Sequence, residues 1–172
     1  MIRRVAGLGA AITLVSSGLA VVGASPALAM CPPDTGYTVH GTSVAMPFRG
    51  VPVFKDGKGG TITVSRAYSG SVSFSVTAGA ETEVGAILAK AKVSISASLT
   101  KTNSTSTTHT YSHDISRGHY GHAQYVSWGK RVSWSKWQQY TSNGRCAVKT
   151  LRSGVIKFPS TSEGWRYWET TS

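Results

Sequence analysis

The five histidines of the chain are the first residues to test for chemistry, because imidazole nitrogens ligate metals and titrate near neutral pH. A zinc site needs three or four ligands at about 2.0 to 2.3 Å from the ion. On a strand, His109 and His113 share a face but lie roughly 13 Å apart. One of them could join His119 or His122 across a turn, and the fifth histidine is His40. Without an H-E-x-x-H or Cys/His knuckle spacing, the sequence predicts no metal site and no cofactor.

The carboxylates do not pair in a way that favours hydrolysis. A glycosidase needs two of them across a sugar-sized cleft, and most of the seven acids here lie beside turns. Glu81 and Glu83 are neighbours, but they open a predicted helix and suit its dipole. No Gly-x-Ser-x-Gly motif marks a nucleophile. We therefore expect a non-enzymatic protein.

The first residues form an export signal. Arg3 and Arg4 give a basic start, residues 5–22 are apolar, and Ala27-Leu28-Ala29 is a small-x-small cleavage site. This order is typical of a secretory signal peptide covering residues 1–29. Ser25-Pro26 and the cleavage site favour removal over the alternative of a membrane anchor. We expect a protein secreted to the extracellular space.

The two cysteines, Cys31 and Cys146, both follow the leader. Export places them in an oxidising compartment, where a disulfide between them is the default. Such a bond would tie the start of the secreted chain to its C-terminal third.

The chain is strongly basic, with 18 Lys and Arg against 7 Asp and Glu. This balance favours anionic partners such as a membrane surface or an acidic protein. The basic residues are scattered and form no dense run, and an exported protein seldom meets nucleic acid, so we expect no nucleic-acid partner.

Residues 30–60 are predicted to be an irregular N-terminal arm, because prolines and glycines interrupt them repeatedly. Short extended pieces are expected at Tyr37-Thr38-Val39 and Val51-Pro52-Val53-Phe54. The arm could pack on the domain or dock on a partner. Its candidate partner-binding residues are Tyr37, Val39, Phe48, Val53 and Phe54.

Residues 61–172 are predicted to form a single β-rich domain. From Thr61 to Ala78 apolar residues alternate with Ser and Thr, which indicates a strand with one apolar face. The alternation resumes on the other parity from Val93 to Ile115. Between the two runs, Val84, Ile87, Leu88 and Ala91 form a helical stripe. We expect one short helix at about 82–92, with a continuous strand hairpin as the alternative.

A third extended region is expected from Tyr120 to Tyr140. Ser142-Asn143-Gly144 reads as a hairpin turn, and Cys146–Phe158 as the returning strand. The aromatic tail 162–168 is expected to pack back on the sheet. The predicted fold is mainly β, an elongated antiparallel sheet or sandwich of long Ser/Thr-rich strands.

All five tryptophans follow residue 118 and are interleaved with arginine and lysine, as is common at protein interfaces. The strand parity predicts that Trp128 and Trp134 belong to the core. The remaining candidates for partner binding are Trp137, Trp165, Trp168, Arg131 and Arg166.

Apolar–polar alternation over ~9 to 11 residues is also typical of a membrane-spanning β-strand. The segments 72–78 and 93–99 could supply such alternation, and Arg66 and Lys101 interrupt the apolar parity beside them. Long Ser/Thr strands flanking a short amphipathic insert make residues 61–140 similar to aerolysin and epsilon-toxin pore-forming proteins. That resemblance implies a membrane-permeabilising toxin.

The secreted chain also resembles small exported β-rich proteins of actinobacteria. The likeness rests on four segments: 86–94, Gly118-His119-Tyr120-Gly121, Trp128-Gly129 and Ser162-Glu163-Gly164-Trp165. Some such proteins are adaptor subunits of secreted antibacterial particles of the umbrella-toxin kind. The leading expectation is therefore a secreted interaction module, an adaptor with other secreted subunits as partners. The pore-forming reading is the alternative.

Overall fold

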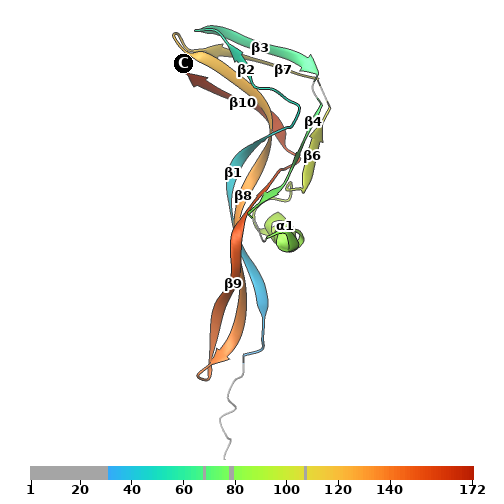
Figure 1. Ribbon diagram of the computed structural model, residues 1–172, viewed down its shortest axis with the longest axis vertical. Coiled ribbons are helices and arrows are strands. Elements are labelled where there is room, and N and C mark those ends of the chain that lie inside the picture. The colour runs from blue at the N-terminus through green and yellow to red at the C-terminus, as the bar shows by residue number, and fades with distance from the viewer. Residues whose placement is uncertain (1–30, 68, 78–79, 107) are drawn as a thin grey trace, which may run out of the picture.

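The computed structural model describes residues 31–67, 69–77, 80–106 and 108–172, so the predicted leader lies outside the described residues. The chain folds as an elongated, mainly β molecule (Figure 1). Its strands pair antiparallel in one large sheet and two small ones, and one helix packs beside them. The predicted fold class is confirmed.

The longest strand, β8 (Tyr120–Ser142), is the axis of the large sheet, whose order is β1-β8-β9-β5. Towards the C-terminal end of the rod, β10 and β2 pair with the first part of β8. The strands around β8 are β1 (Thr35–Pro47), β2 (Phe54–Asp56), β5 (Ser75–Val76), β9 (Arg145–Phe158) and β10 (Glu163–Thr170).

The turn between β8 and β9 has the predicted hairpin chemistry. Asn143 and Gly144 have φ of 49° and 70°, the left-handed pair that matches the twist of the flanking strands. Close by, Cys31 and Cys146 form the predicted disulfide, with a Cα–Cα distance of 5.6 Å. The bond fixes the start of the described chain to this end of the molecule.

The N-terminal arm is not irregular, and that prediction is wrong for most of its length. Strand β1 pairs with β8 at every position from Thr35 to Pro47. Its glycines serve close packing: a Cβ on Gly36 would lie 2.5 Å from the Trp137 ring, and one on Gly41 would lie 2.7 Å from Ile95. Both glycines are therefore strand positions where another side chain approaches the backbone.

The run predicted as one strand from Thr61 to Ala78 is divided. It contains β3 (Gly60–Ala67), β4 (Gly70–Ser73) and β5, while β6 (Thr102–Thr105) and β7 (Thr108–Ile115) return beside them. Strand β3 pairs with β7, and β4 pairs with β6, as two ribbons. Strand β5 instead pairs with β9 of the large sheet.

The predicted helix is confirmed as a 3₁₀ turn, η1 (Glu81–Glu83), followed by α1 (Val84–Ser94). The strand predicted from Val93 onwards is wrong up to Leu99, because the helix continues to Ser94 and a turn follows. Burial overrides the alternation here: Leu99 and the stripe of α1 pack into one core with the large sheet. This core contains Val84, Ile87, Leu88, Ala91, Leu99, Val132, Trp134, Ile156 and Phe158.

Candidate functional site

The two ribbons share one register, and this makes them a single interrupted hairpin. Gly60 lies opposite Ile115 and Ala67 opposite Thr108 in the first ribbon. Gly70 lies opposite Thr105 in the second, which continues the same one-to-one count across the break. The last rung is the bond from Phe74 N to Lys101 O, 2.8 Å long. Residues 75–100 are therefore an insert at the closed end of a hairpin.

Beyond Phe74 the insert leaves the hairpin and lies on the large sheet, with α1 against its face (Figure 1). Ile87 and Ala91 are fully buried there. The other side of α1 is exposed and mixed: Gly85, Ala86, Ala89 and Val93, which is 87% exposed, lie there beside Lys90, Lys92 and Ser94. Packing on the sheet explains the buried stripe of α1 but not why Val93 is left in solvent.

A buried carboxylate clips the insert to the sheet. Glu83, only 9% exposed, accepts hydrogen bonds from Lys136 Nζ at 3.1 Å and from the Tyr37 hydroxyl. The hydrogen bonds from Tyr37 and then Lys136 lower the pKa of Glu83. The same hydrogen bond to Glu83, followed by burial, raises the pKa of Tyr37. Glu83 is thus an anion in the docked insert at neutral pH.

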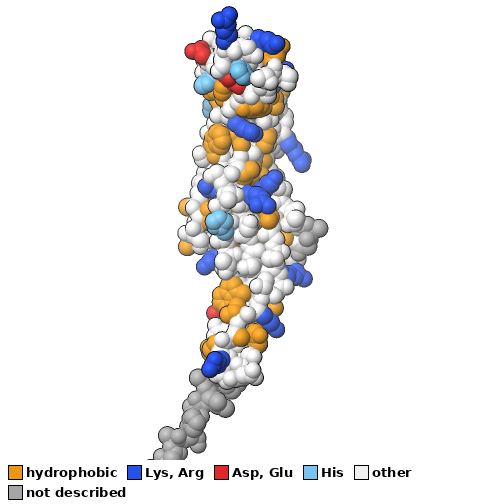
Figure 2. Space-filling model, turned by 90° about the vertical axis from the view of Figure 1, so that its left-hand side faces the viewer, with side chains coloured by type: hydrophobic (Ala, Val, Ile, Leu, Met, Phe, Trp, Pro, Cys, Tyr) orange, Lys and Arg blue, Asp and Glu red, His pale blue; other side chains and the backbone are white. Residues whose placement is uncertain are grey.

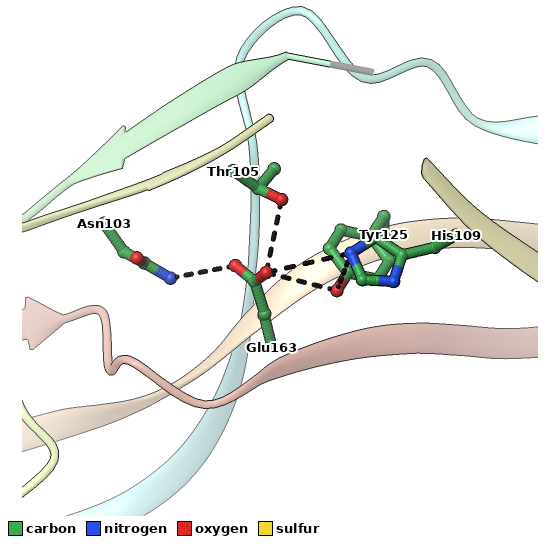
Figure 3. A network of polar contacts seen from close by, with 5 residues as sticks. All are labelled: Asn103, Thr105, His109, Tyr125 and Glu163. Atoms are coloured by element: carbon green, nitrogen blue, oxygen red, sulfur yellow. Dashed lines mark hydrogen bonds and ion pairs between the residues drawn. The ribbon is translucent and has the colours of Figure 1, made fainter. Parts of the chain in front are cut away.

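A second carboxylate network fastens the ribbons to the large sheet (Figure 3). Glu163 of β10 accepts hydrogen bonds from Asn103 and Thr105 of β6, at 3.3 and 3.2 Å. Tyr125 of β8 donates to the same carboxylate at 3.2 Å, and its oxygen lies 2.9 Å from His109 Nε2. The five side chains come from β6, β7, β8 and β10 and converge where the two ribbons meet.

The chemistry of this network favours holding over proton transfer. Burial, and then the charge of Glu163, raise the pKa of Tyr125 to about 12. The phenol therefore keeps its proton at neutral pH and acts as a hydrogen-bond donor to Glu163. His109 stacks on the Tyr125 ring, with centroids 4.4 Å apart, which fixes the imidazole against β8.

Glu169 makes a similar contact at the other end of the ribbon. It accepts hydrogen bonds from Tyr167 Oη at 2.6 Å and from the Ser116 N–H, just beyond β7, at 2.9 Å. These bonds, led by that of Tyr167, lower the pKa of Glu169 to about 2. The ribbons are thus tied to β10 by two carboxylates.

Three of the histidines, His109, His113 and His122, pack on aromatic rings. His113 packs on Tyr167, His122 stacks on Trp168, and His119 lies near its own loop carbonyl at Arg117. Among the described residues, no three His, Cys, Asp or Glu side chains come together as metal ligands.

The predicted partner-binding residues do not form one surface. Phe48 is 2% exposed and packs on Tyr125, so its prediction as a binding residue is wrong. Val53 is exposed, whereas Val39 packs against the core of α1. Tyr37 holds Glu83, and Phe54 lies edge-on to Trp165.

The aromatic residues after 118 divide between core and surface. Trp134 is buried as predicted, but Trp128 is 42% exposed, against the prediction from its parity. The position of Trp128 explains its exposure. Its indole lies over the backbone at Gly164 of β10 and not over the core. Trp137 packs on Gly36, and Trp168 lies between His122 and Arg166. Trp165 packs against the hydrophobic cluster of Ile62, Val64, Ile115 and Ala123.

The scattered basic side chains have no acidic neighbours in sequence over a long part of the chain. No acidic residue occurs between Asp114 and Glu163, a range that contains both β8 and β9. Figure 2 shows Lys and Arg side chains along the whole length of one face, with few acidic ones. Arg131 and Lys157 even lie directly opposite each other on β8 and β9. Anionic partners fit this charge better than neutral ones.

Sequence reasoning missed the partners of Glu83 and Glu163. Glu83 was assigned to the helix dipole, and no local pattern reveals Lys136, which lies far along the chain. The comparisons bring no family: no protein-family model matches the chain, and no relative appears among curated proteins. No helix in the described ranges is long and apolar enough to cross a membrane.

Proposed function

We propose that this protein permeabilises membranes, and that residues 75–100 refold into a membrane-spanning β-hairpin. The register of the two ribbons carries the proposal. If the pairing that joins Phe74 to Lys101 continues, Ser75 faces Thr100, Val76 faces Leu99, and the turn falls at Ile87-Leu88. The two new strands, 75–86 and 89–100, each exceed the ~9 to 11 residues that span a bilayer.

The continued register sorts the insert into one apolar and one polar face. In this register an even-numbered residue lies opposite an odd-numbered one, as Val76 does opposite Leu99. This accounts for the apolar residues being even-numbered in the first alternating run and odd-numbered in the second. Directly opposed residues share a face. The apolar face collects Val76, Ala78, Ala80, Thr82, Val84, Ala86, Ala89, Ala91, Val93, Ile95, Ala97 and Leu99.

The other face is polar, as the lumen side of a barrel requires. It consists of Ser75, Thr77, Gly79, Glu81, Glu83, Gly85, Lys90, Lys92, Ser94, Ser96, Ser98 and Thr100. Glu83 falls directly opposite Lys92 in this register. The carboxylate that is paired with Lys136 in the docked insert thus finds a new cation in the extended hairpin.

The exposed side of α1 fits the same proposal. Ala86, Ala89 and Val93 face solvent on the helix, but all three fall on the lipid face of the hairpin. Arg66 and Lys101, which interrupt the apolar parity, lie outside residues 75–100. The positions of these apolar residues are therefore explained by the extended hairpin and not by packing of the helix.

Export, expected from the leader, would bring the protein to other cells, and its basic surface would favour anionic bilayers. The test is dye release from anionic liposomes by the secreted chain, together with SDS-resistant oligomers on those liposomes. We expect release at micromolar protein or below. Intact liposomes at that concentration would remove the proposal.

An adaptor role in a secreted toxin complex is the second candidate. It is supported by apolar side chains that stay exposed at the β8–β9 end, namely Tyr140, Val148 and Leu151. Tagged protein recovered from culture supernatant would then bring specific secreted subunits with it. A lone monomer, combined with liposome leakage, would favour the first candidate.

A further inference from the structure

Strand β1 leaves a long edge without a partner. It pairs with β8 on one side, and in the part of the chain that the structure describes no strand lies on the other. Soluble proteins blunt such edges with charges, prolines or bulges. From Thr35 to Met46 β1 contains no charged residue and no proline, and Pro47 comes only at its end. This edge is therefore suited to receiving another strand.

The opposite edge of the same sheet is only partly covered. Strand β5 covers β9 at Ile156 and Lys157. Thr77 extends the cover by one residue, because its N–H and hydroxyl both bond to the Val155 carbonyl and its Oγ1 accepts from the Val155 N–H. From Arg145 to Gly154 no described strand lies on the side of β9 that faces away from β8. The covering residues, 75–77, belong to the insert.

The directions of these strands permit an open-ended assembly. Both β1 and β9 run antiparallel to β8, so they are parallel to each other (Figure 1). The β1 of one copy can then join the β9 of the next with all copies pointing the same way. A contact between two different edges is heterologous and closes into a ring when the rotation allows it.

The proposed function also requires several copies. Each chain supplies one hairpin of two strands, whereas membrane barrels start at about eight strands. At least about four copies must therefore meet, with their hairpins side by side and pointing the same way.

We propose that β1 of one copy pairs with β9 of the next, and that β5 controls this contact. The inference rests on the proposed function, because β5 leaves β9 when the insert extends. Its departure uncovers β9 from Val155 to Lys157 and lengthens the edge open to a neighbouring β1. Insertion therefore lengthens the contact by three residues, which couples assembly to the extension of the insert.

Cysteines at Thr38 and Ser153 test the contact. Both residues are exposed and both lie opposite Ser135, one on each side of β8. Within one chain they are separated by two strand spacings, roughly 9.5 Å. This exceeds the ~7 Å between Cα atoms that a disulfide can bridge, so only neighbouring copies can cross-link. A second variant, Thr38→Cys/Thr150→Cys, would detect the same contact if Thr38 of the neighbouring copy lies closer to the β8–β9 turn.

Oxidation of Thr38→Cys/Ser153→Cys on anionic liposomes should give a ladder of cross-linked copies. An equimolar mixture of the two single variants should stop at dimers, and neither single variant should cross-link alone. Dye release is recorded in the same samples. A ladder without release would support the edge contact and overturn the proposed function.

Two results would overturn the edge contact. The first is dye release by both double-cysteine proteins without any cross-linked species. The second is dimers of Thr38→Cys alone, which would show that β1 meets β1 of another copy. Either result leaves the proposed function standing.

Discussion

In the proposed hairpin Lys92 would take the place of Lys136 as the partner of one carboxylate, Glu83. Lys136 holds Glu83 at 3.1 Å in the docked insert, and Lys92, exposed on α1, faces it only in the extended register. Removing one partner from a buried hydrogen-bonded charge is costly because the other is left unsatisfied. The two lysines should therefore have opposite effects on membrane activity.

We predict that Lys136→Met lowers the protein concentration for half-maximal dye release by roughly tenfold, because only the docked form loses a partner. Lys92→Met should raise that concentration by a similar factor and leave the melting temperature unchanged. The measurement is a dye-release titration of both variants beside the wild type. Equal shifts in one direction would contradict the exchange of partners.

Acid should loosen the docked insert through the same residue. The folded pKa of Glu83 lies below its ordinary value of 4.5, so its ionised form adds stability that is complete above about pH 4.5. This stability is lost as the pH falls toward the lowered pKa. We predict that the melting temperature of the protein in solution falls below about pH 4.5, and that this fall is smaller in Glu83→Gln. An equal pH response in Glu83→Gln would assign the effect to other groups.

Sequence reasoning at this scale succeeded where the signal was local. The turn at Asn143-Gly144 and the pair Cys31–Cys146 carry their chemistry in their own residue types. The partners of Glu83, Lys136 and Tyr37, come from β8 and β1, and only the folded sheet brings them together. Phe48 was misassigned for the same reason, since Tyr125 covers it from a distant strand.

At the scale of elements, the insert is one sequence with two periodicities. Its helical stripe is buried in α1, while its strand parity would be satisfied only in the proposed hairpin. Val93 and Ser94 separate the two, since both are exposed at the end of α1 but fall on opposite faces of the hairpin.

We predict that Val93→Lys abolishes dye release while Ser94→Lys retains it. A lysine on the lipid face near the bilayer midplane costs about 2 to 4 kcal/mol, and every copy in a ring pays it. Neither variant should change the melting temperature, because both side chains face solvent in the folded protein. Equal activity of the two variants would contradict the register.

The sequence predicted the strands of the large sheet better than the insert. Strands β8 and β9 form where they were predicted because each has a paired neighbour along its whole length, although the buried parity of β8 changes around Trp128. The segment Val93–Leu99 has the same alternation but forms a helix end and a turn, since Leu99 and Ile95 gain burial on the sheet. Only Tyr37-Thr38-Val39 of β1 was predicted as extended, because Gly36 and Gly41 resemble loop residues until Trp137 and Ile95 are placed against them.

At the scale of the whole molecule, charge and shape separate two tasks. Glu163 and Glu169 are used to hold the ribbons, and every Lys, Arg, Asp or Glu in β8 and β9 is a Lys or an Arg. Attraction between this surface and anionic lipids is screened by salt. We predict that liposome binding falls several-fold between about 0.05 and 0.5 M NaCl and is weak on neutral lipid, as measured by co-sedimentation. Binding that is indifferent to salt would contradict an electrostatic approach.

The central claim is that the insert must leave the sheet, and a reversible lock tests it most directly. A Cβ on Gly41 would lie 2.7 Å from the Ile95 side chain, so Gly41→Cys/Ile95→Cys places two cysteines within disulfide reach between β1 and the end of the insert. Ile95 lies on the lipid face of the hairpin, where cysteine is tolerated. The single variants and wild type under the same reductant control for the native disulfide.

We predict that the oxidised double variant binds anionic liposomes but releases no dye, and that reduction restores release to the level of the reduced wild type. Release by the oxidised, cross-linked protein at the wild-type rate would show that the insert can stay on the sheet. That result would contradict the account.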